Sequence, residues 1–260
     1  MRSGIYRALI VLGLLFSACA TACGTMRTTG NGGTKVESDR APAAGNQAAR
    51  PALPPSQRRI DCAKVKCVAL TFDDGPSLHT PKLLDTLRRS DTRVTFFVLG
   101  QNVERHGATV RRMVHEGHEV GNHSWDHPIM PSLSPRAMRR QIQLTQQAVR
   151  QASGVTPKVF RPPYGATDER VARAAGMPQI TWSVDCMDWH RTKARKGIAT
   201  GMKEARPGGI ILLHDTHGST VRAVPKMLST LKGRGFTLVT VSELFQGKRF
   251  EAQATYTNLE

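Results

Sequence analysis

Acidic residues are scarce in this sequence. Its 260 residues include 37 Lys and Arg but only 20 Asp and Glu, which gives a formal net charge of +17 at pH 7. Such an excess favours polyanionic partners, and nucleic acid is the first candidate. The N-terminal sequence argues against nucleic acid because it predicts export. Outside a cell a polyanionic wall or membrane surface fits the charge better, and a scattered, solvated surface is an equal alternative.

Long apolar runs are also missing. The longest, Ala8–Ala18, is too short to span a bilayer, and Arg2 and Arg7 precede it. A basic start followed by a short apolar run and small residues is typical of a signal peptide, which we assign to residues 1–23. Its removal would leave a formal charge of 17 − 2 = +15.

Two processing routes fit the end of this segment. The sequence FSAC at Phe16–Cys19 resembles a bacterial lipobox, although Phe16 replaces the usual aliphatic residue, and Cys23 is a second candidate for lipid attachment. Ala20–Ala22 would suit an ordinary signal peptidase. We favour the lipid, and in either case expect an exported protein, extracellular or anchored to the outer face of the cell membrane.

Cysteine is sparse, and no internal repeat is present. After the N-terminal segment only Cys62, Cys67 and Cys186 remain, so no second cysteine pair could complete a structural zinc site. Cys62 and Cys67 bracket a short loop, which predicts a local disulfide and leaves Cys186 as a buried free thiol. Residues 24–60 are rich in Gly, Thr, Ala and Pro, and we interpret them as a disordered linker.

From Cys67 onward, short apolar runs alternate with amphipathic segments. Seven runs have the composition of strands: Cys67–Phe72, Val94–Val98, His118–Gly121, Lys158–Phe160, Gln179–Val184, Gly209–Leu213 and Phe236–Thr240. Repeated βα units predict a parallel sheet with helices outside. About seven units predict an irregular, TIM-barrel-like (β/α)7 barrel, which we place at residues 61–248, with residues 249–260 as a C-terminal tail.

Two helix starts are clear. Thr80 and Pro81 have the chemistry of an N-cap and a first turn, and so do Ser134 and Pro135. The apolar face of the second helix would be formed by Met138, Ile142, Thr145 and Val149. Between these helices lie loops at the carboxyl ends of strands, which is where function gathers in a barrel.

The run Cys67–Phe72 leads directly into Asp73, Asp74 and Gly-Pro. This order predicts a buried strand that ends in a sharp turn. Because side chains alternate along a strand, Asp73 and Asp74 should diverge, so that one can bind a metal while the other faces the reacting water. By itself the pattern would equally fit a solvated turn.

The sequence GNHSWDHP at Gly121–Pro128 follows the third expected strand. Two imidazoles four positions apart would share one face of a helical turn, within reach of one metal ion, and Pro128 should end that turn. Asp74, His123 and His127 would then form an N,N,O site with open positions for water and substrate. Such a site is typical of a catalytic ion, with zinc as the first candidate.

Five motifs in order resemble those of the polysaccharide deacetylases, carbohydrate esterase family 4. They are TFDDGP at Thr71–Pro76, HSWDH at His123–His127, RPPYG at Arg161–Gly165, DCMDW at Asp185–Trp189 and LLHD at Leu212–Asp215. One motif would be weak support, whereas five in order are specific, and the similarity covers roughly residues 66–245. The resemblance implies the barrel-like fold of that family and hydrolysis of N- or O-acetyl groups on polysaccharides with a bound metal.

The resemblance also implies roles for the first three motifs. Its metal ligands match Asp74, His123 and His127. Asp73 matches the base that takes a proton from the attacking water. Arg161 is similar to the arginine that pairs with this base, and its charge should keep the carboxylate ionised.

The remaining roles come from the third, fourth and fifth motifs. The Tyr164 amide, which follows two prolines without N–H groups, matches the donor that helps polarise the acetyl oxygen. His214 matches the general acid, and Asp185 resembles the carboxylate that orients it. Trp189 would form part of the groove wall, and Leu212 would line the pocket for the acetyl methyl group.

The expected function is removal of N-acetyl groups from N-acetylglucosamine-containing polysaccharide, either peptidoglycan or chitin oligomers. Acetyl-xylan esterase activity is one alternative, because loops around the groove choose the polymer. A catalytically silent protein that binds wall glycan is another. The cofactor would be Zn²⁺, with Co²⁺ or another divalent ion as alternatives, and we expect a monomer that does not bind nucleic acid.

Overall fold

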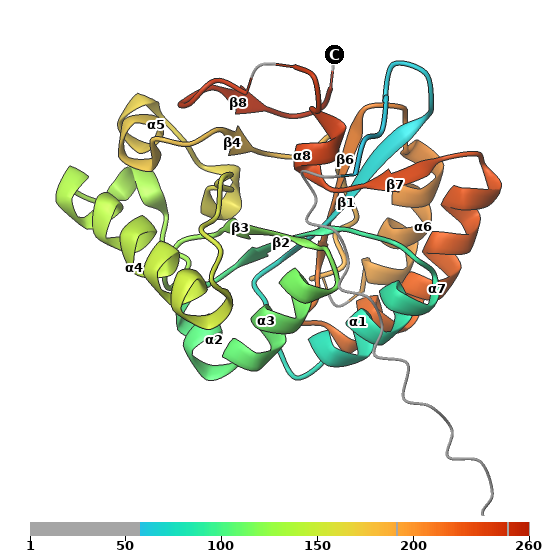
Figure 1. The fold of residues 1–260 in the computed structure, drawn as a ribbon, viewed down its shortest axis with the longest axis horizontal. Helices are drawn as coiled ribbons and strands as arrows, with labels where there is room; N and C mark the ends of the chain where they lie inside the picture. The colour runs from blue at the N-terminus through green and yellow to red at the C-terminus, as the bar shows by residue number, and fades with distance from the viewer. Residues whose placement is uncertain (1–57, 191, 249, 260) are drawn as a thin grey trace, which may run out of the picture. The chain divides into compact units, whose positions relative to one another are not determined.

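The computed structural model describes residues 58–190, 192–248 and 250–259. The expected signal peptide and most of the expected linker lie outside these residues. The elements are β1 (Cys67–Asp73), α1 (Thr80–Arg89), β2 (Thr95–Val98), α2 (Gly100–Arg105), α3 (Gly107–His115), β3 (Glu119–Asn122), η2 (Met130–Ser132), α4 (Pro135–Ser153), η3 (Pro163–Gly165), α5 (Glu169–Ala175), β4 (Gln179–Ile180), β5 (Val184–Asp185), α6 (Ala194–Glu204), β6 (Gly209–His214), α7 (Gly218–Gly233), β7 (Thr237–Val239), α8 (Val241–Leu244) and β8 (Thr255–Tyr256). Figure 1 shows α1 to α4, α6 and α7 outside the strands. Within the described ranges no helix is long and apolar enough to cross a membrane.

Strand β1 is the centre of the sheet. It pairs in parallel with β2, β6 and β7, and the sheet runs β3-β2-β1-β6-β5. Alternate residues of β1 enter two separate apolar clusters: Val68, Leu70 and Phe72 join one, and Cys67 and Ala69 join the other. A parallel strand buried on both faces explains the continuous apolar run. The expected α/β barrel-like architecture is confirmed.

Two expected strands differ in the structure. Within Lys158–Phe160 only Phe160 forms isolated bridges, to Asn122 and Gln179. Prolines on both sides of this run lack the N–H groups that would extend the ladder. The run Gln179–Val184 divides into β4 and β5, because the Thr181 amide donates to Tyr256 and the Ser183 amide to Ile210, at 2.9 Å each.

The two expected helix starts also differ in outcome. Ser134 caps α4, since its hydroxyl oxygen accepts the Ala137 amide, and the predicted apolar face of α4 is buried. Thr80 does not cap α1 but is its first residue, and His79 occupies the cap without a side-chain hydrogen bond. The Thr80 hydroxyl instead donates to buried Asp215, and its oxygen accepts the Ser77 amide at 2.7 Å.

The structure contains the expected disulfide between Cys62 and Cys67 at the start of β1, and Cys186 is a buried free thiol. This disulfide lies at the opposite end of β1 from the two aspartates. It therefore constrains the entry of the chain into the barrel and takes no part in the polar site.

The C-terminal segment contains a strand that the sequence does not predict. β8 pairs in parallel with β4, and Tyr256 packs against Phe245 and Phe250 with ring centroids 5.1 Å apart in each case. The Leu259 amide donates to the Gly208 carbonyl at 2.8 Å. The segment thus connects β4 with the beginning of β6, and Figure 1 shows it running beside β4.

We expect Tyr256→Ala to lower the free energy of unfolding by about 2 kcal/mol, because a partly buried ring loses its contacts with two other rings. Tyr256→Phe should retain most of the stability, since it keeps the ring contacts and loses the hydroxyl group whose oxygen accepts the Glu251 amide. Urea denaturation of the two variants measures both effects. An alanine variant as stable as the parent would show that the C-terminal segment does not stabilise the barrel.

Candidate active site

A pocket of about 380 Å³ lies at the carboxyl ends of the strands. It is lined by Asp73, Asp74, His123, His127, Tyr164, Trp182, Asp185, Trp189, Leu212 and His214. The barrel therefore brings together nine side chains that the sequence singles out, with Trp182 as the addition. Arg161 lies behind this lining and is fully buried.

The carboxylates of Asp73 and Asp74, at the end of β1, lie in different surroundings. Asp73 ends the strand and is 2% exposed, whereas Asp74 is only partly buried and has a backbone φ of 69°. This left-handed conformation turns the chain sharply. The Asn102 side chain donates to the Asp74 carbonyl at 2.8 Å, and the Leu99 amide donates to the Gly75 carbonyl at 3.0 Å. These bonds hold the turn against the start of α2.

The loop after β3 carries both imidazoles, but it is not helical. Ser124 and His127 have φ values of 71° and 66°, so the predicted helical turn is wrong. Pro128 disfavours helical geometry at His127. The Ser124 amide donates to Asn122 Oδ1 at 2.9 Å, and the His127 amide donates to Ser124 Oγ at 3.1 Å. This loop still brings the two imidazole rings to a centroid separation of 4.9 Å.

Asp74, His123 and His127 form a group that fits one metal ion. Nε2 of each imidazole lies 3.5 Å from the same oxygen, Asp74 Oδ1. One ligand atom from each of the three residues lies within 4.8 Å of the others. Asp74 Oδ1 is buried and receives no hydrogen bond from the described residues. A buried carboxylate oxygen without a donor is costly, and a cation would satisfy it.

A hydrogen bond at Nδ1 orients the His123 ring so that its other nitrogen can bind a metal ion. Its Nδ1 lies 2.7 Å from the Arg161 carbonyl oxygen, which can only accept, so Nδ1 carries the proton and the Nε2 lone pair faces Asp74. Burial lowers the pKa of His123 to about 3. The ring is therefore neutral at pH 7, as a metal ligand must be.

Arg161 connects the base candidate to the rest of the barrel. Its Nη1 donates to Asp73 Oδ1 at 2.8 Å and to Thr71 Oγ1 at 2.7 Å. Its other nitrogens donate to the carbonyls of Ile180 and Thr181 at 3.0 and 2.8 Å. Burial raises the pKa of Asp73, and the positive charge of Arg161 opposes that rise.

The prediction that Asp185 orients His214 is wrong. Asp188, not Asp185, accepts the His214 Nδ1 hydrogen bond at 2.8 Å. The second oxygen of Asp188 accepts the His214 backbone amide and the Thr220 hydroxyl, both at 2.7 Å. Asp185 pairs in register with Leu212, two positions short of His214, and its carboxylate accepts the Met187 amide at 2.7 Å.

The surroundings of His214 favour its charged form. Burial acts to lower the pKa of His214, but the hydrogen bond to Asp188 and the charges of Asp73, Asp188 and Asp74 outweigh it and raise the pKa to about 9. The ring is therefore protonated at pH 7. A group that must donate a proton in a reaction near neutrality needs this state.

Aromatic and apolar side chains form the remaining walls. Tyr164 is 66% exposed, has a φ of 60°, and packs its ring against His127 with centroids 4.5 Å apart. Trp189 is 49% exposed, and Leu212 is buried at the base of the wall. Trp182 was not singled out from the sequence, because nothing in its motif distinguishes it from a core residue. Its ring centroid lies 5.8 Å from the Arg161 guanidinium carbon.

Asp215 also supports the site, although the sequence indicates no role for it. It is fully buried, accepts a hydrogen bond from the Thr80 hydroxyl, and accepts the Ser77 hydroxyl at its backbone carbonyl at 2.7 Å. A methyl group added at Gly75 would collide with its carboxylate. Asp215 therefore links the end of β6 to the turn that follows Asp73 and Asp74.

Comparisons with known proteins identify the family of this chain. A family model described as polysaccharide deacetylase matches residues 61–180. Chitooligosaccharide deacetylase of a Bradyrhizobium species is 34% identical over 203 residues, which cover 71% of this chain and 93% of the relative. This chain belongs to the polysaccharide deacetylase family.

Two further proteins are more similar to this chain in sequence. Peptidoglycan-N-acetylglucosamine deacetylase PgdA of Listeria monocytogenes is 44% identical over 202 residues, covering 75% of this chain and 43% of the relative. This chain thus spans less than half of the Listeria protein. The solved structure of T48 deacetylase with substrate has 46% identity and a TM-score of 0.74, covering 76% of this chain and 99% of that one.

We expect Asp74→Asn to weaken the binding of a divalent cation at least tenfold, because the substitution removes the only negative charge among the three ligand side chains. Zinc titration of the metal-stripped full chain by calorimetry measures the affinity. Asp126→Asn is the matched control, since Asp126 lies in the loop that carries His123 and His127 but bonds to Gln141. Equal zinc affinity in Asp74→Asn and the parent would contradict the ligand assignment.

Proposed function

We propose that this polysaccharide deacetylase removes N-acetyl groups from N-acetylglucosamine-containing glycans outside the cell membrane. One observation carries the proposal: Asp73 and His214 are register partners at the ends of the adjacent parallel strands β1 and β6. A carboxylate base and a protonated imidazole thus face one pocket beside the ligand group for a metal. This is the arrangement that acid–base hydrolysis of an amide requires.

Asp73 would start the reaction. Asp74, His123 and His127 would hold a divalent cation, for which Zn²⁺ is the first choice, and this ion would supply Lewis-acid chemistry towards the attacking water and the acetyl carbonyl. Asp73 takes a proton from that water as its oxygen bonds to the carbonyl carbon. Burial makes this carboxylate more basic than an exposed aspartate, while Arg161 holds its orientation.

His214 would complete the reaction. As the carbon–nitrogen bond breaks, the imidazolium gives its proton to the nitrogen, and the products are acetate and the free amino sugar. Asp188 holds the ring through Nδ1, so that Nε2 is the nitrogen that donates. Protonation of the nitrogen is essential because an amide anion is a poor leaving group.

The other walls would position the acetylated sugar. The Tyr164 amide belongs to a strained turn with a positive φ and follows two prolines, so it is suited to stabilise charge on the acetyl oxygen. Leu212 closes the base of the pocket, where it suits the acetyl methyl group. Trp189 presents an exposed indole on which a sugar ring can stack.

The names of the relatives support N-acetylated substrates, with peptidoglycan first and chitin oligomers second. Acetyl-xylan esterase activity uses the same groups and remains the alternative within the family. A silent wall-binding protein is less well supported, since the ligand group, Asp73 and His214 are all in place. The expected signal peptide and lipid attachment support action outside the membrane. We expect the protein to act as a monomer.

We expect the full chain to release acetate from peptidoglycan or chitopentaose, and to release little from acetylated xylan. EDTA should abolish the release and added Zn²⁺ should restore it. Asp73→Asn should reduce kcat by roughly 10² to 10⁴ while zinc still binds. If the zinc-loaded protein released no acetate from any of the three glycans, this result would contradict the proposed activity.

We expect Asp188→Asn to shift the alkaline limb of the kcat–pH profile to lower pH by at least about one unit. The backbone amide of His214 and the Thr220 hydroxyl orient the asparagine oxygen, so its NH₂ group faces His214 Nδ1 and disfavours the protonated ring. Because the raised pKa of His214 keeps it protonated up to about pH 9, a lower pKa removes the acid earlier as the pH rises.

Asp185→Asn is the matched control for this experiment. It changes a carboxylate in the same motif that bonds to the Met187 amide rather than to His214. Its profile should therefore stay close to that of the parent. If Asp185→Asn shifted the limb and Asp188→Asn did not, the assignment of Asp188 would be wrong.

A further inference from the structure

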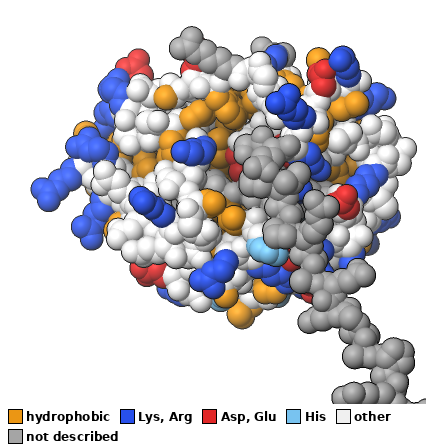
Figure 2. Space-filling view, viewed as in Figure 1, with side chains coloured by type: hydrophobic (Ala, Val, Ile, Leu, Met, Phe, Trp, Pro, Cys, Tyr) orange, Lys and Arg blue, Asp and Glu red, His pale blue; other side chains and the backbone are white. Residues whose placement is uncertain are grey.

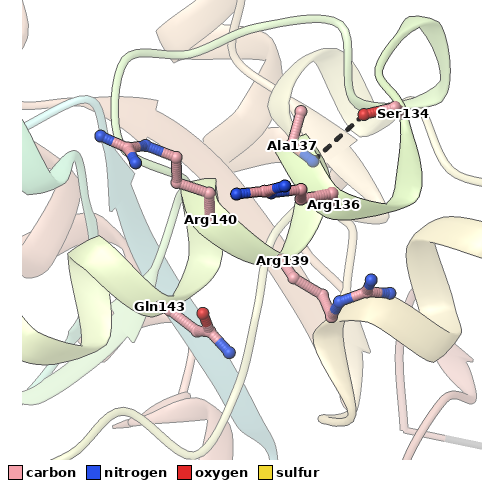
Figure 3. A pocket seen from close by; sticks show the side chains of 6 residues that line it. All are labelled: Ser134, Arg136, Ala137, Arg139, Arg140 and Gln143. Atoms are coloured by element: carbon pink, nitrogen blue, oxygen red, sulfur yellow. Dashed lines mark hydrogen bonds between the residues drawn. The ribbon is translucent and has the colours of Figure 1, made fainter.

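The amino-terminal half of α4 carries a surface of one charge sign. Arg136, Arg139 and Arg140 are exposed and line a hollow of about 430 Å³ together with Ser134, Ala137 and Gln143. Figure 3 shows the three guanidinium groups spread across the first turns of the helix, with Arg136 between Arg140 and Arg139. We call these three residues the arginine surface.

The arginine surface has no acidic counterpart nearby in the chain. The sequence contains no Asp or Glu from residue 127 to residue 167. Among the described residues, none forms an ion pair or a side-chain hydrogen bond with Arg136, Arg139 or Arg140. Figure 2 shows Lys and Arg side chains along the edge that α4 occupies, with few acidic side chains among them. Three guanidinium groups are therefore free to bind an anion from outside.

This arrangement is unfavourable for the helix itself. Positive side chains at the amino end oppose the helix dipole, and α4 has no acidic residue in its first turn. Arg136 lies three and four positions from Arg139 and Arg140, which are the spacings at which like charges repel on a helix. An anionic partner would remove both penalties. The placement therefore favours binding over a contribution to stability.

The helix that carries the arginine surface also contacts the loop that precedes His127. Gln141, the next residue after Arg140, accepts the amides of Trp125 and Asp126 at 2.8 and 3.2 Å, and its own amide donates to Asp126 at 2.7 Å. Asp126 immediately precedes the ligand residue His127. A polymer whose acetylated sugar occupies the pocket can therefore extend over the arginine surface.

We infer that the arginine surface binds carboxylate groups of an acidic glycan strand, so that the substrate is a carboxylate-bearing polymer rather than a neutral one. This inference rests on the proposed function for the identity of the strand. Guanidinium groups pair with carboxylates in a planar, two-bond geometry, which suits them to this task. Deacetylation adds an ammonium charge to the strand, so the same surface favours acetylated substrate over product.

The test compares two variants of the full chain with equal changes in charge. Arg136→Gln/Arg139→Gln/Arg140→Gln removes the arginine surface and keeps good helix-forming residues. Arg150→Gln/Lys158→Gln/Lys226→Gln is the control, since these three exposed side chains form no ion pair or hydrogen bond with the described residues and lie outside the hollow. The substrates are peptidoglycan fragments with free peptide carboxylates and the same fragments with those carboxylates amidated.

We expect the arginine-surface variant to raise KM for the carboxylated fragments about tenfold with little change in kcat, and to reduce the salt dependence of kcat/KM. Its kinetics on the amidated fragments should equal those of the parent, and the control variant should resemble the parent on both. Unchanged KM for the carboxylated fragments would overturn the inference. An equal loss on both fragments would also overturn it, because it would indicate a disturbed loop at His127.

A binding experiment separates this inference from the proposed function. If the parent released no acetate from either fragment, the proposed function would fail, and fluorescence anisotropy with labelled carboxylated fragments would still test the surface. Weaker binding by the arginine-surface variant alone would support the inference. Equal binding by both variants, or surface-dependent binding only to phosphatidylglycerol vesicles, would overturn it.

Discussion

The buried pair of Arg161 and Asp73 is the interaction on which the site depends. Arg161 is fully buried, and its guanidinium bonds to β1 through Thr71 and Asp73 and to the carbonyls of Ile180 and Thr181. A buried charge is tolerated only when it is paired and its hydrogen bonds are satisfied. Removing one partner of such a pair costs roughly 3 to 5 kcal/mol. The pair thus fixes Asp73 and joins β1 to β4.

The same linkage explains why a short C-terminal strand matters for the site. β8 pairs with β4, and the Thr181 amide donates to Tyr256 while the Thr181 carbonyl accepts from Arg161. Each partner therefore holds the next in place, from the C-terminal segment to the base candidate. The polar site is supported from behind by backbone groups, whose positions the barrel determines.

Charge is distributed for two different tasks. Inside the pocket, acidic groups surround His214 and raise its pKa to about 9, which keeps a proton available. Outside it, the arginine surface on α4 forms no ion pair with an acidic side chain of the described residues. One pattern holds a proton for chemistry at a single bond, and the other suits attraction of an extended anionic strand.

The sequence by itself determined the architecture and most of the pocket. Apolar runs buried on both faces predict parallel strands, and the motifs at their carboxyl ends predict Asp73, Asp74, His123, His127 and His214. These side chains meet in one pocket because strand pairing places successive carboxyl ends at one edge of a barrel. The local sequence pattern was sufficient to predict those contacts that follow directly from the direction of the strands.

Only the tertiary structure decided which groups touch. Asp185 and Asp188 belong to one motif, and strand register leaves Asp185 beside Leu212 while the following turn carries Asp188 to His214. The loop that carries His123 and His127 contains residues in the left-handed conformation instead of a helical turn. Strand β8 forms by pairing with β4. These outcomes depend on partners distant in the chain, which composition and spacing do not encode.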